Sequence, residues 1–456
     1  MNDPHNTMIL TMNRPNMGFW NLSIPKTKKS IITLHHGTKS YQIDLNHVHR
    51  LGENTISLTP RISHTLLLPK HIKEYKMRPL CSKHYILGPL VGILVSENKL
   101  RRLLAGKVDP VYRWYARVLQ QNKGLAVFFS PNRILWIKDK VVGVVRVPGN
   151  KQEVWIEESL PIPSVIYDRC FGNHNRSKSK IIRKKCALHS PTIKVINPVV
   201  KLGKRRIYTL YGQIPRFQKN LPRWDILRRD NIDTLLEQFP IAYVKPDRLS
   251  KGKGVTKVSR TPYGFLVEQN RKGKNYRHLC PSPIDVLQDL EPYISDHGFM
   301  VVQEAIPLMT FQGHPFDFRL LLQKDKSGRW KKTGVAARIS GEGSIISSPR
   351  SGGSVSTYNE VMAHLSKISR MDVASSMLIL ALDLAKTIDD VIGPFVELGF
   401  DLGVDINGQV KIIEVNGIPL KVSIERLKDR KITRSAHEHP IGYAIYLAGF
   451  GGLYYD

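Results

Sequence analysis

Two carboxylates and an amide surround a turn signal late in the chain. The stretch Glu397–Pro419 carries Asp401, Glu414 and Asn416 on either side of the dipeptide Asn407-Gly408. Asn-Gly between two strand-like runs predicts a β-hairpin with a two-residue type I′ turn, because both residues tolerate a positive φ. That register pairs 406 with 409, 404 with 411 and 401 with 414. The two carboxylates then stand opposite each other, with Asn416 on the same face.

Opposed carboxylates repel each other, so this pattern favours a bound cation over a purely structural role. Magnesium takes oxygen ligands and is often held by one or two carboxylates together with substrate phosphates. A solvated acidic hairpin face that binds nothing is the alternative. The other face of the hairpin is apolar and is expected to be buried; it carries Phe400, Leu402, Val404, Ile406, Ile413 and Val415.

The segment Ile241–Arg260 has the composition of a phosphate-binding hairpin. Its sequence IAYVKPDRLSKGKGVTKVSR predicts a strand, a glycine-rich loop and a second strand. Glycines let backbone N–H groups approach phosphate oxygens, and lysines supply the counter-charge. Lys245 lies in an otherwise apolar strand and needs an anionic partner if it is buried. The loop lacks the GxxxxGK[ST] pattern of a P-loop, so a plain basic hairpin stays open as an alternative.

Other polar residues are placed on apolar strands further along the chain. FMVVQEAIPLMTF carries Gln303 and Glu304, and PFDFRLLLQKD places Asp317 and Arg319 on one strand face. Arg338 follows in VAARIS, before a Gly/Ser loop at residues 347–357. Residues 361–392 have helical periodicity. These side chains are the remaining candidates for a polar site.

Composition limits the class of protein and its partners. The 456 residues suffice for two or three domains, and the 41% hydrophobic content is typical of a globular chain. A net charge of +31 implies anionic partners, such as a nucleotide, an acidic polymer or nucleic acid. Nucleic acid is possible but not favoured, because no zinc finger or RNA-binding aromatic motif occurs. The four scattered cysteines, the lack of a signal peptide and the short apolar runs predict a cytoplasmic protein with no membrane partner.

The pattern of elements predicts three parts. Residues 1–80 contain short strand-like runs, including SIITLHHG, SYQIDLN, NTISLTP and HTLLLP, and are expected to form a β-rich module. Strands alternate with helices through residues 81–195, which indicates an open α/β domain. Residues 196–456 carry all the candidate site residues.

The order of these parts resembles an ATP-grasp nucleotide-binding domain. LGPLVGILV, LPIPSVIYDR, VKPDRLSKGKGV, QEAIPL, FDFRLLLQKDKSGRW, ARIS and ELGFDLGVDINGQVKIIEVN are similar to the YheC/YheD family of spore-associated ATP-grasp proteins. The resemblance runs from about residue 85 to 420, and the N-terminal module fits the longer, YheD-like members. It implies an α/β (α+β) ATP-grasp fold preceded by an α/β domain, with ATP and Mg²⁺ as cofactors and association with the spore.

The resemblance also implies a role for each candidate residue. Two lysines and a glycine flap would contact the ATP phosphates: Lys204, Lys245, Lys251, Gly252, Lys253 and Gly254. The nucleoside would meet a hinge and one carboxylate: Gln303, Glu304, Ile306 and Asp317. The catalytic pair that stabilises the transferring phosphoryl group would be Arg319 and Arg338. Magnesium would be held by Asp401, Glu414 and Asn416.

ATP-grasp enzymes phosphorylate a carboxylate and let an amine or other nucleophile displace the phosphate, which requires placement and charge neutralisation. The resemblance therefore implies an ATP-dependent carboxylate–amine ligase with unknown substrates, among which an anionic polymer stays open. One position departs from the pattern: Ser347-Ser348-Pro349 stands where related ligases often carry asparagine. A coat-associated structural protein that binds ATP without turnover is one alternative. A polyanion-binding or nucleic-acid-binding protein is the other.

Overall fold

The chain forms two compact units. The computed structural model describes residues 8–11, 20–22, 31–44, 50–52, 55–72, 74–81, 83–149, 153–170, 173–197, 202–247, 254–271, 274–297, 299–349, 352–364 and 370–451. Unit 1 comprises Met1–Pro198, Lys324–Arg329 and His437–Asp456, and unit 2 comprises Val199–Gln323 and Trp330–Ala436. The three-part division at residues 80 and 195 stays a prediction.

Unit 1 begins with an eight-stranded sheet in the order β4-β3-β8-β7-β1-β2-β6-β5. Ile32, Leu34, Tyr75 and Leu87 are buried in its core. The strand predicted at HTLLLP is wrong. A helix ends within this segment, at Thr65, because Thr59 caps the helix and Pro60 occupies its first turn. The elements are β1 (Met8–Thr11), β2 (Trp20–Leu22), β3 (Ile31–His36), β4 (Lys39–Asp44), β5 (Arg50–Gly52), β6 (Thr55–Leu58), α1 (Pro60–Thr65), β7 (Glu74–Cys81) and β8 (His84–Gly88).

A seven-stranded sheet follows, with parallel pairing along β10-β9-β14-β15. Side chains alternate along β10, so Phe128 meets Tyr112 of α3 while Val127 and Phe129 cluster with Ile182 of α4. Helices therefore cover both faces, as expected for an open α/β sheet. The elements are β9 (Leu90–Leu94), α2 (Glu97–Leu104), α3 (Pro110–Gln121), β10 (Leu125–Phe129), η2 (Pro131–Arg133), β11 (Ile134–Leu135), η3 (Trp136–Lys138), β12 (Lys140–Val147), β13 (Val154–Pro161), β14 (Val165–Asp168), α4 (Asn173–His189), β15 (Lys194–Ile196) and, near the C-terminal end, η5 (Tyr446–Phe450).

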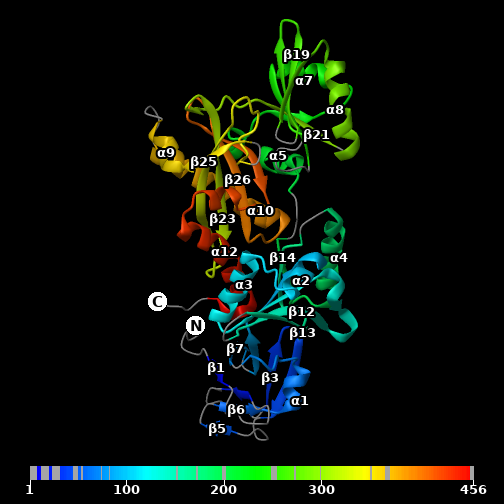
Figure 1. Ribbon diagram of the computed structural model, residues 1–456, viewed down its shortest axis with the longest axis vertical. Coiled ribbons are helices and arrows are strands. Elements are labelled where there is room, and N and C mark those ends of the chain that lie inside the picture. The colour runs from blue at the N-terminus through cyan, green and yellow to red at the C-terminus, as the bar shows by residue number, and fades with distance from the viewer. Residues whose placement is uncertain are drawn as a thin grey trace. The chain divides into compact units, whose positions relative to one another are not determined.

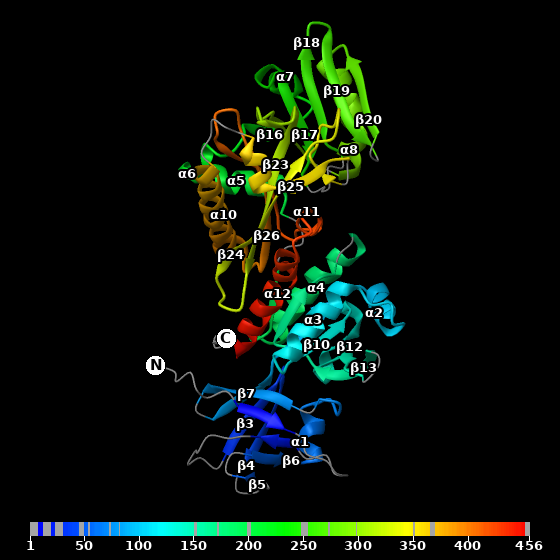
Figure 2. The same cartoon turned by 60° about the vertical axis from the view of Figure 1, so that its left-hand side comes forward.

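The first sheet of unit 2 is antiparallel and six-stranded, in the order β16-β21-β17-β18-β19-β20. Helices α7 and α8 pack against it through an apolar core that includes Leu235, Val244 and Leu290 (Figure 2). The elements are α5 (Lys204–Gly212), α6 (Pro215–Gln218), β16 (Trp224–Ile226), α7 (Ile232–Gln238), β17 (Ile241–Pro246), β18 (Thr256–Thr261), β19 (Gly264–Arg271), β20 (Lys274–Cys280), α8 (Pro283–His297) and β21 (Met300–Glu304).

The second sheet of unit 2 has the order β25-β24-β23-β26-β27, and β22 pairs with β23. Helix α10 covers it in Figure 1, with Leu384 and Ile388 in the same core as Phe318 and Phe400. The interior strand β26, between β23 and β27, is buried along its whole length. The elements are β22 (Thr310–Phe311), β23 (His314–Lys324), β24 (Trp330–Ile339), β25 (Ser354–Thr357), α9 (Tyr358–Ala363), α10 (Arg370–Ile392), β26 (Glu397–Val404), β27 (Val410–Asn416), α11 (Val422–Arg426) and α12 (Arg430–Ile445).

The β26–β27 hairpin confirms one predicted pairing and corrects the turn. Asp401 pairs with Glu414 as predicted, but Val404 pairs with Val410, so the predicted pairs 404–411 and 406–409 are wrong. Asp405 controls the loop, because its Oδ1 accepts from the N–H groups of Asn407 and Gln409 at 3.0 and 2.9 Å. Of the two residues predicted at positive φ, only Gly408 has one (+79°), so the turn is not type I′.

A β-bulge next to Asp401 restores the predicted register. Leu402 pairs with Ile412, so Ile413 is the extra residue on β27. Ile413 therefore lines the cavity beside Glu414 and not the buried face where the sequence placed it. Ile406 was also predicted to be buried, and it is 63% exposed in the loop.

The described helices are each too short or too polar to cross a membrane. The four cysteines are free thiols; three of them are buried and Cys81 is exposed.

Candidate functional site

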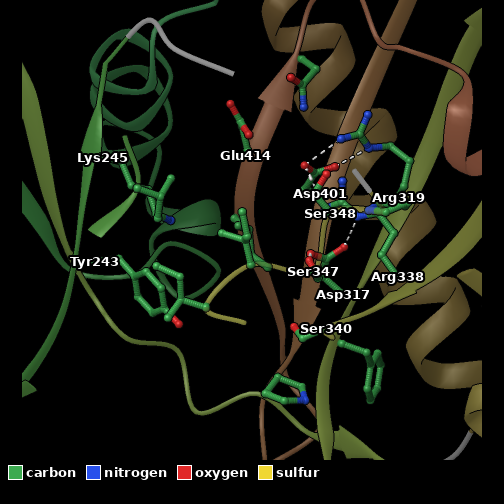
Figure 3. Close-up of a pocket in the computed structure, with 18 of the residues that line it drawn as sticks. Tyr243, Lys245, Asp317, Arg319, Arg338, Ser340, Ser347, Ser348, Asp401 and Glu414 are labelled. Atoms are coloured by element: carbon green, nitrogen blue, oxygen red, sulfur yellow. Dashed lines mark hydrogen bonds and ion pairs between the residues drawn. The ribbon is translucent and has the colours of Figure 1, made fainter. Parts of the chain in front are cut away.

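A cavity of about 270 Å³ opens between the two sheets of unit 2. Figure 3 shows Lys245 and Tyr243 of β17 on one wall, with Arg319, Arg338 and Asp401 on the other. Ten of the predicted site residues line this cavity: Lys204, Lys245, Gln303, Ile306, Asp317, Arg319, Arg338, Asp401, Glu414 and Asn416.

The Asp401 carboxylate is held by two arginines. It is 3% exposed, and Arg319 donates to both of its oxygens, one of them through Nη2 at 2.9 Å. The Nη2 atom of Arg338 lies 3.0 Å from Asp401 Oδ2. Burial alone would raise the pKa of Asp401, but these two guanidinium groups outweigh it and hold that pKa below its usual value. Asp401 is therefore an anion that already has cationic partners.

This pairing changes the electrostatics expected for the β26–β27 hairpin. From the sequence, Asp401 and Glu414 are expected to face each other, with their repulsion relieved by a cation. They are opposite in register, but Asp401 turns to the arginines, and Glu414 Oε1 lies 3.2 Å from Lys204 Nζ. Gly399 is needed nearby, because a Cβ there would lie 2.7 Å from the Pro419 Cβ atom and 3.5 Å from Arg319 Nη1.

A second carboxylate connects Arg338 to the Gly/Ser loop. Arg338 Nε donates to Asp317 Oδ1 at 2.6 Å, and the Ser347 hydroxyl donates to the other Asp317 oxygen. Burial would lower the pKa of Arg338, but Asp317 and Asp401 outweigh burial and raise it. Ser347, at the position that departs from the family pattern, therefore fastens its loop to the floor of the cavity.

Lys245 is a buried cation bound to a neutral group. It is 8% exposed, and its Nζ donates to the amide oxygen of Gln303 at 2.8 Å. Burial and the charge of Lys204 lower the pKa of Lys245 to about 8, against the opposing effect of Glu414, Asp401 and Asp317. From the sequence, a buried Lys245 is expected to contact an anion. In the structure it contacts the Gln303 amide oxygen in place of one. An anion entering the cavity would gain from both lysines.

Helix α5 carries side chains that contact both walls of the cavity. Lys204 begins the helix and reaches Glu414. One turn later the Tyr208 hydroxyl lies 2.8 Å from the carbonyl oxygen of Ile413 and 3.0 Å from Gln303 Oε1. The sequence analysis missed Tyr208, although its i,i+4 spacing from Lys204 places both on one helix face.

The predicted hinge residues divide into two groups. Gln303 faces the cavity, but its amide oxygen is already bonded to Lys245. Glu304 does not line the cavity; its carboxylate accepts from the backbone N–H and the Nε of Arg223, both at 2.7 Å. Ile306 does line the cavity. Sequence reasoning gave no signal for several other cavity-lining residues: Tyr243, Ser344, Ile345, Ile346, Leu420, Val422 and Ser423.

Most of the predicted flap lies outside the described residues. This applies to Lys251, Gly252 and Lys253. Gly254 has a φ of +69°, and a Cβ there would lie 2.9 Å from the ring of Pro246, so glycine fits this position. Gly254 is not among the cavity-lining residues, whereas its neighbour Val255 is.

The predicted magnesium ligands offer oxygen donors of the kind that Mg²⁺ prefers. Glu414 and Asn416 lie two residues apart on β27, and the buried Nδ2 of Asn416 has no hydrogen-bond partner within the described part of the chain. The same part of the chain contains no cluster of three His, Cys, Asp or Glu side chains that could hold a metal. The donors fit magnesium bound jointly with phosphate oxygens, and Asp401 could join only by giving up arginine contacts.

Comparison with known proteins identifies relatives of this chain. A family model described as "YheC/D like ATP-grasp" matches residues 192–447, more than half of the chain. The chain is 27% identical to the endospore coat-associated protein YheD of Bacillus subtilis (strain 168), over 94% of this chain and 93% of YheD. It is 21% identical to the endospore coat-associated protein YheC of the same strain, over 60% of this chain and 75% of YheC.

Solved structures give a looser likeness. The D-Ala:D-Ser ligase VanG from Enterococcus faecalis is 11% identical, and the alignment covers 80% of this chain and 99% of VanG. The TM-score is 0.44, which is too low for chemistry to be transferred from one protein to the other.

Proposed function

From the premise that this chain belongs to the YheC/D-like ATP-grasp family and has its fold, we propose that the unit 2 cavity binds Mg-ATP. The observation that supports this most is the buried pair of lysines, Lys204 and Lys245, in a cavity whose other wall carries oxygen donors. Four cationic side chains line the cavity against three carboxylates. A polyanionic nucleotide would offset that excess.

The two lysines would contact phosphate oxygens, and Ile306 would lie against the nucleoside. Glu414 and Asn416 would hold magnesium, with Asp401 as a third oxygen donor. When bound, magnesium supplies positive charge between neighbouring phosphate oxygens. Every other contribution comes from the chain itself, which positions the reactants and keeps water out of a site that is largely buried.

We further propose a carboxylate–amine ligase reaction. A substrate carboxylate oxygen attacks the γ-phosphorus, the bond to ADP breaks, and an acyl phosphate forms. An amine then attacks the acyl carbon, phosphate leaves, and the amine loses a proton. Arg319 and Arg338 are the groups placed to stabilise negative charge at the transferring phosphoryl group. Each arginine would have to divide its contacts between the phosphoryl group and the carboxylate that it already binds, Asp401 for Arg319 and Asp317 for Arg338.

One structural feature favours the alternative of ATP binding without turnover. Asp401 and Asp317 occupy both arginines, and Ser347 fastens the neighbouring loop to Asp317. Spore association is also part of the proposal, since both named relatives are described as endospore coat-associated. An acidic polymer could serve as the carboxylate substrate, given the net charge of +31.

Hydroxylamine trapping distinguishes a carboxylate–amine ligase from a protein that binds ATP without turnover. The protein is incubated with Mg-ATP, hydroxylamine and one candidate carboxylate at a time, and both ADP and hydroxamate are measured. A carboxylate that yields the two products in equal amounts, and fails to do so with Glu414→Gln, supports the ligase. If ATP binds but neither product forms across the panel, the non-catalytic alternative holds.

A further inference from the structure

The outward face of α4 in unit 1 combines lysines with exposed aliphatic side chains. We define the α4 face by Ile137, Lys138, Lys180, Ile181, Lys184 and Leu188. Ile137 is fully exposed, Leu188 is 86% exposed and Ile181 is 52% exposed. Exposure of this degree is unusual for three large aliphatic residues near one helix.

The helix must present these residues outward. Ser179, Ile182 and Cys186 are buried on its inner side, where the latter two join the core of the seven-stranded sheet. Residue 184 lies four positions after 180 and three after 181, and residue 188 lies four positions after 184. These residues therefore form one stripe on the opposite side of the helix. The aliphatic members of this stripe contribute nothing to the core.

Helix η3 is docked against the C-terminal end of α4. The Trp136 and His189 rings meet edge to face with centroids 5.4 Å apart, and Lys185 Nζ lies 5.9 Å from the Trp136 ring centroid. His189 Nε2 also lies 2.9 Å from Asp139 Oδ1. Ile137 and Leu188 are the chain neighbours of these packed rings, so the apolar residues of both helices belong to one region.

Positive charge in this region is not neutralised. Residues 169–198 of unit 1 contain eight Lys and Arg and no Asp or Glu. The nearby acids have other partners: Asp168 binds Arg183 and Ser179, and Asp139 binds Lys39 and His189. Within the described residues, Lys138, Lys180 and Lys184 form no ion pair or hydrogen bond.

We propose that the α4 face binds the surface of an anionic lipid bilayer, with the helix lying in the plane of the headgroups. Lysines attract the negative surface, and the aliphatic side chains enter the boundary between headgroups and acyl chains. Nucleic acid fits less well, because it would leave three aliphatic side chains in water. Single-stranded nucleic acid is also bound by stacking of its bases on aromatic residues. This surface contact runs against the sequence-based expectation of no membrane partner, and it does not depend on the proposed ATP site.

Vesicle flotation of the full-length protein tests the proposal. Vesicles of phosphatidylglycerol and phosphatidylcholine are compared with vesicles of phosphatidylcholine alone. The protein should float with the first and stay behind with the second. Each lysine near an anionic surface strengthens binding roughly fivefold, so Lys180→Gln with Lys184→Gln should weaken it about 30-fold. Lys70→Gln with Lys107→Gln is the charge-matched control on exposed lysines elsewhere in unit 1, and it should bind normally.

The aliphatic residues discriminate lipid from other polyanions. Ile137→Ser with Leu188→Ser should weaken vesicle binding at least tenfold, whereas Leu80→Ser, also exposed in unit 1, should not. These sites are on the surface, and a normal melting temperature shows that the variants fold. No flotation with anionic vesicles overturns the proposal. So does full binding by the aliphatic variant, or tighter binding to DNA that only the lysine variant loses.

Discussion

Asp401→Asn should perturb the site more than any other single change. The carboxylate is buried and accepts from both Arg319 and Arg338. Asparagine keeps the size but removes the negative charge, so Arg338 keeps Asp317 as a carboxylate partner while the half-buried Arg319 loses the carboxylate it contacts. Removing one partner from a buried ion pair costs about 3–5 kcal/mol. We expect a loss of this size in the free energy of unfolding.

Urea unfolding at pH 7 measures that loss, with Glu414→Gln as the matched acid-to-amide control. The Glu414 side chain is 25% exposed and has a single ion pair, with Lys204 at 3.2 Å, so the control should lose less than the Asp401 variant. In thermal unfolding, the Asp401 variant should melt about 6–20 °C lower if unit 2 unfolds as one domain.

The pH dependence gives an independent check. The folded pKa of Asp401 is depressed, so its stabilisation is present above about pH 4 and is lost as pH falls through the lower folded value. The gap between the variant and the unchanged protein should therefore close in strong acid. Equal stabilities at pH 7, or equal losses for the Asp401 and Glu414 variants, would refute the ion network described here.

Three further outcomes follow from other contacts in the cavity. The pKa of Lys245 is lowered to about 8 in the fold, so its buried charge destabilises the metal-free protein below that pH, and the cost fades as pH rises toward about 10.4. Lys245→Met should raise the melting temperature at pH 7 and remove this trend; an unchanged pH profile would contradict the assignment. Tyr208→Phe should cost about 1–3 kcal/mol in urea unfolding, because the buried hydroxyl shared by Gln303 Oε1 and the Ile413 carbonyl oxygen is lost, and a loss below 0.5 kcal/mol would contradict that. Ser347→Ala should speed amide exchange in residues 344–349 while changing global stability by no more than about 1 kcal/mol; unchanged exchange rates would show that the bond to Asp317 does not restrain the loop.

The hairpin shows what sequence periodicity can and cannot determine. An assumed two-residue Asn-Gly turn led to the observed pairing of Asp401 with Glu414. The sequence pattern could not reveal the Asp405 side chain that reshapes the turn, nor the bulge at Ile413 that compensates for it. The wrong turn shifts the register by one residue, and the bulge shifts it back. The pairing at Asp401 is therefore as predicted, while the pairs nearer the turn are not.

Ion pairing was the part least accessible from sequence. Arg319 was predicted to share a strand face with Asp317. Its ion pair is with Asp401, the residue directly opposite it on the neighbouring strand β26. Which carboxylate an arginine takes depends on the distance between neighbouring strands, and a linear pattern does not contain that information. The N-terminal module was predicted as β-rich, but the strand at HTLLLP failed because capping by Thr59 outweighed the apolar run.

Calorimetric titration with ATP tests the central claim most directly. The unchanged protein, Lys245→Met and the exposed-lysine control Lys107→Met are each titrated at pH 7, with and without magnesium. A charge-assisted hydrogen bond contributes about 1.5–3 kcal/mol, so Lys245→Met should weaken Mg-ATP binding at least tenfold while the control keeps full affinity. ATP without magnesium should bind far more weakly to the unchanged protein. Equal affinity of Lys245→Met and the unchanged protein, or no binding of Mg-ATP by the unchanged protein, would contradict the assignment of this cavity.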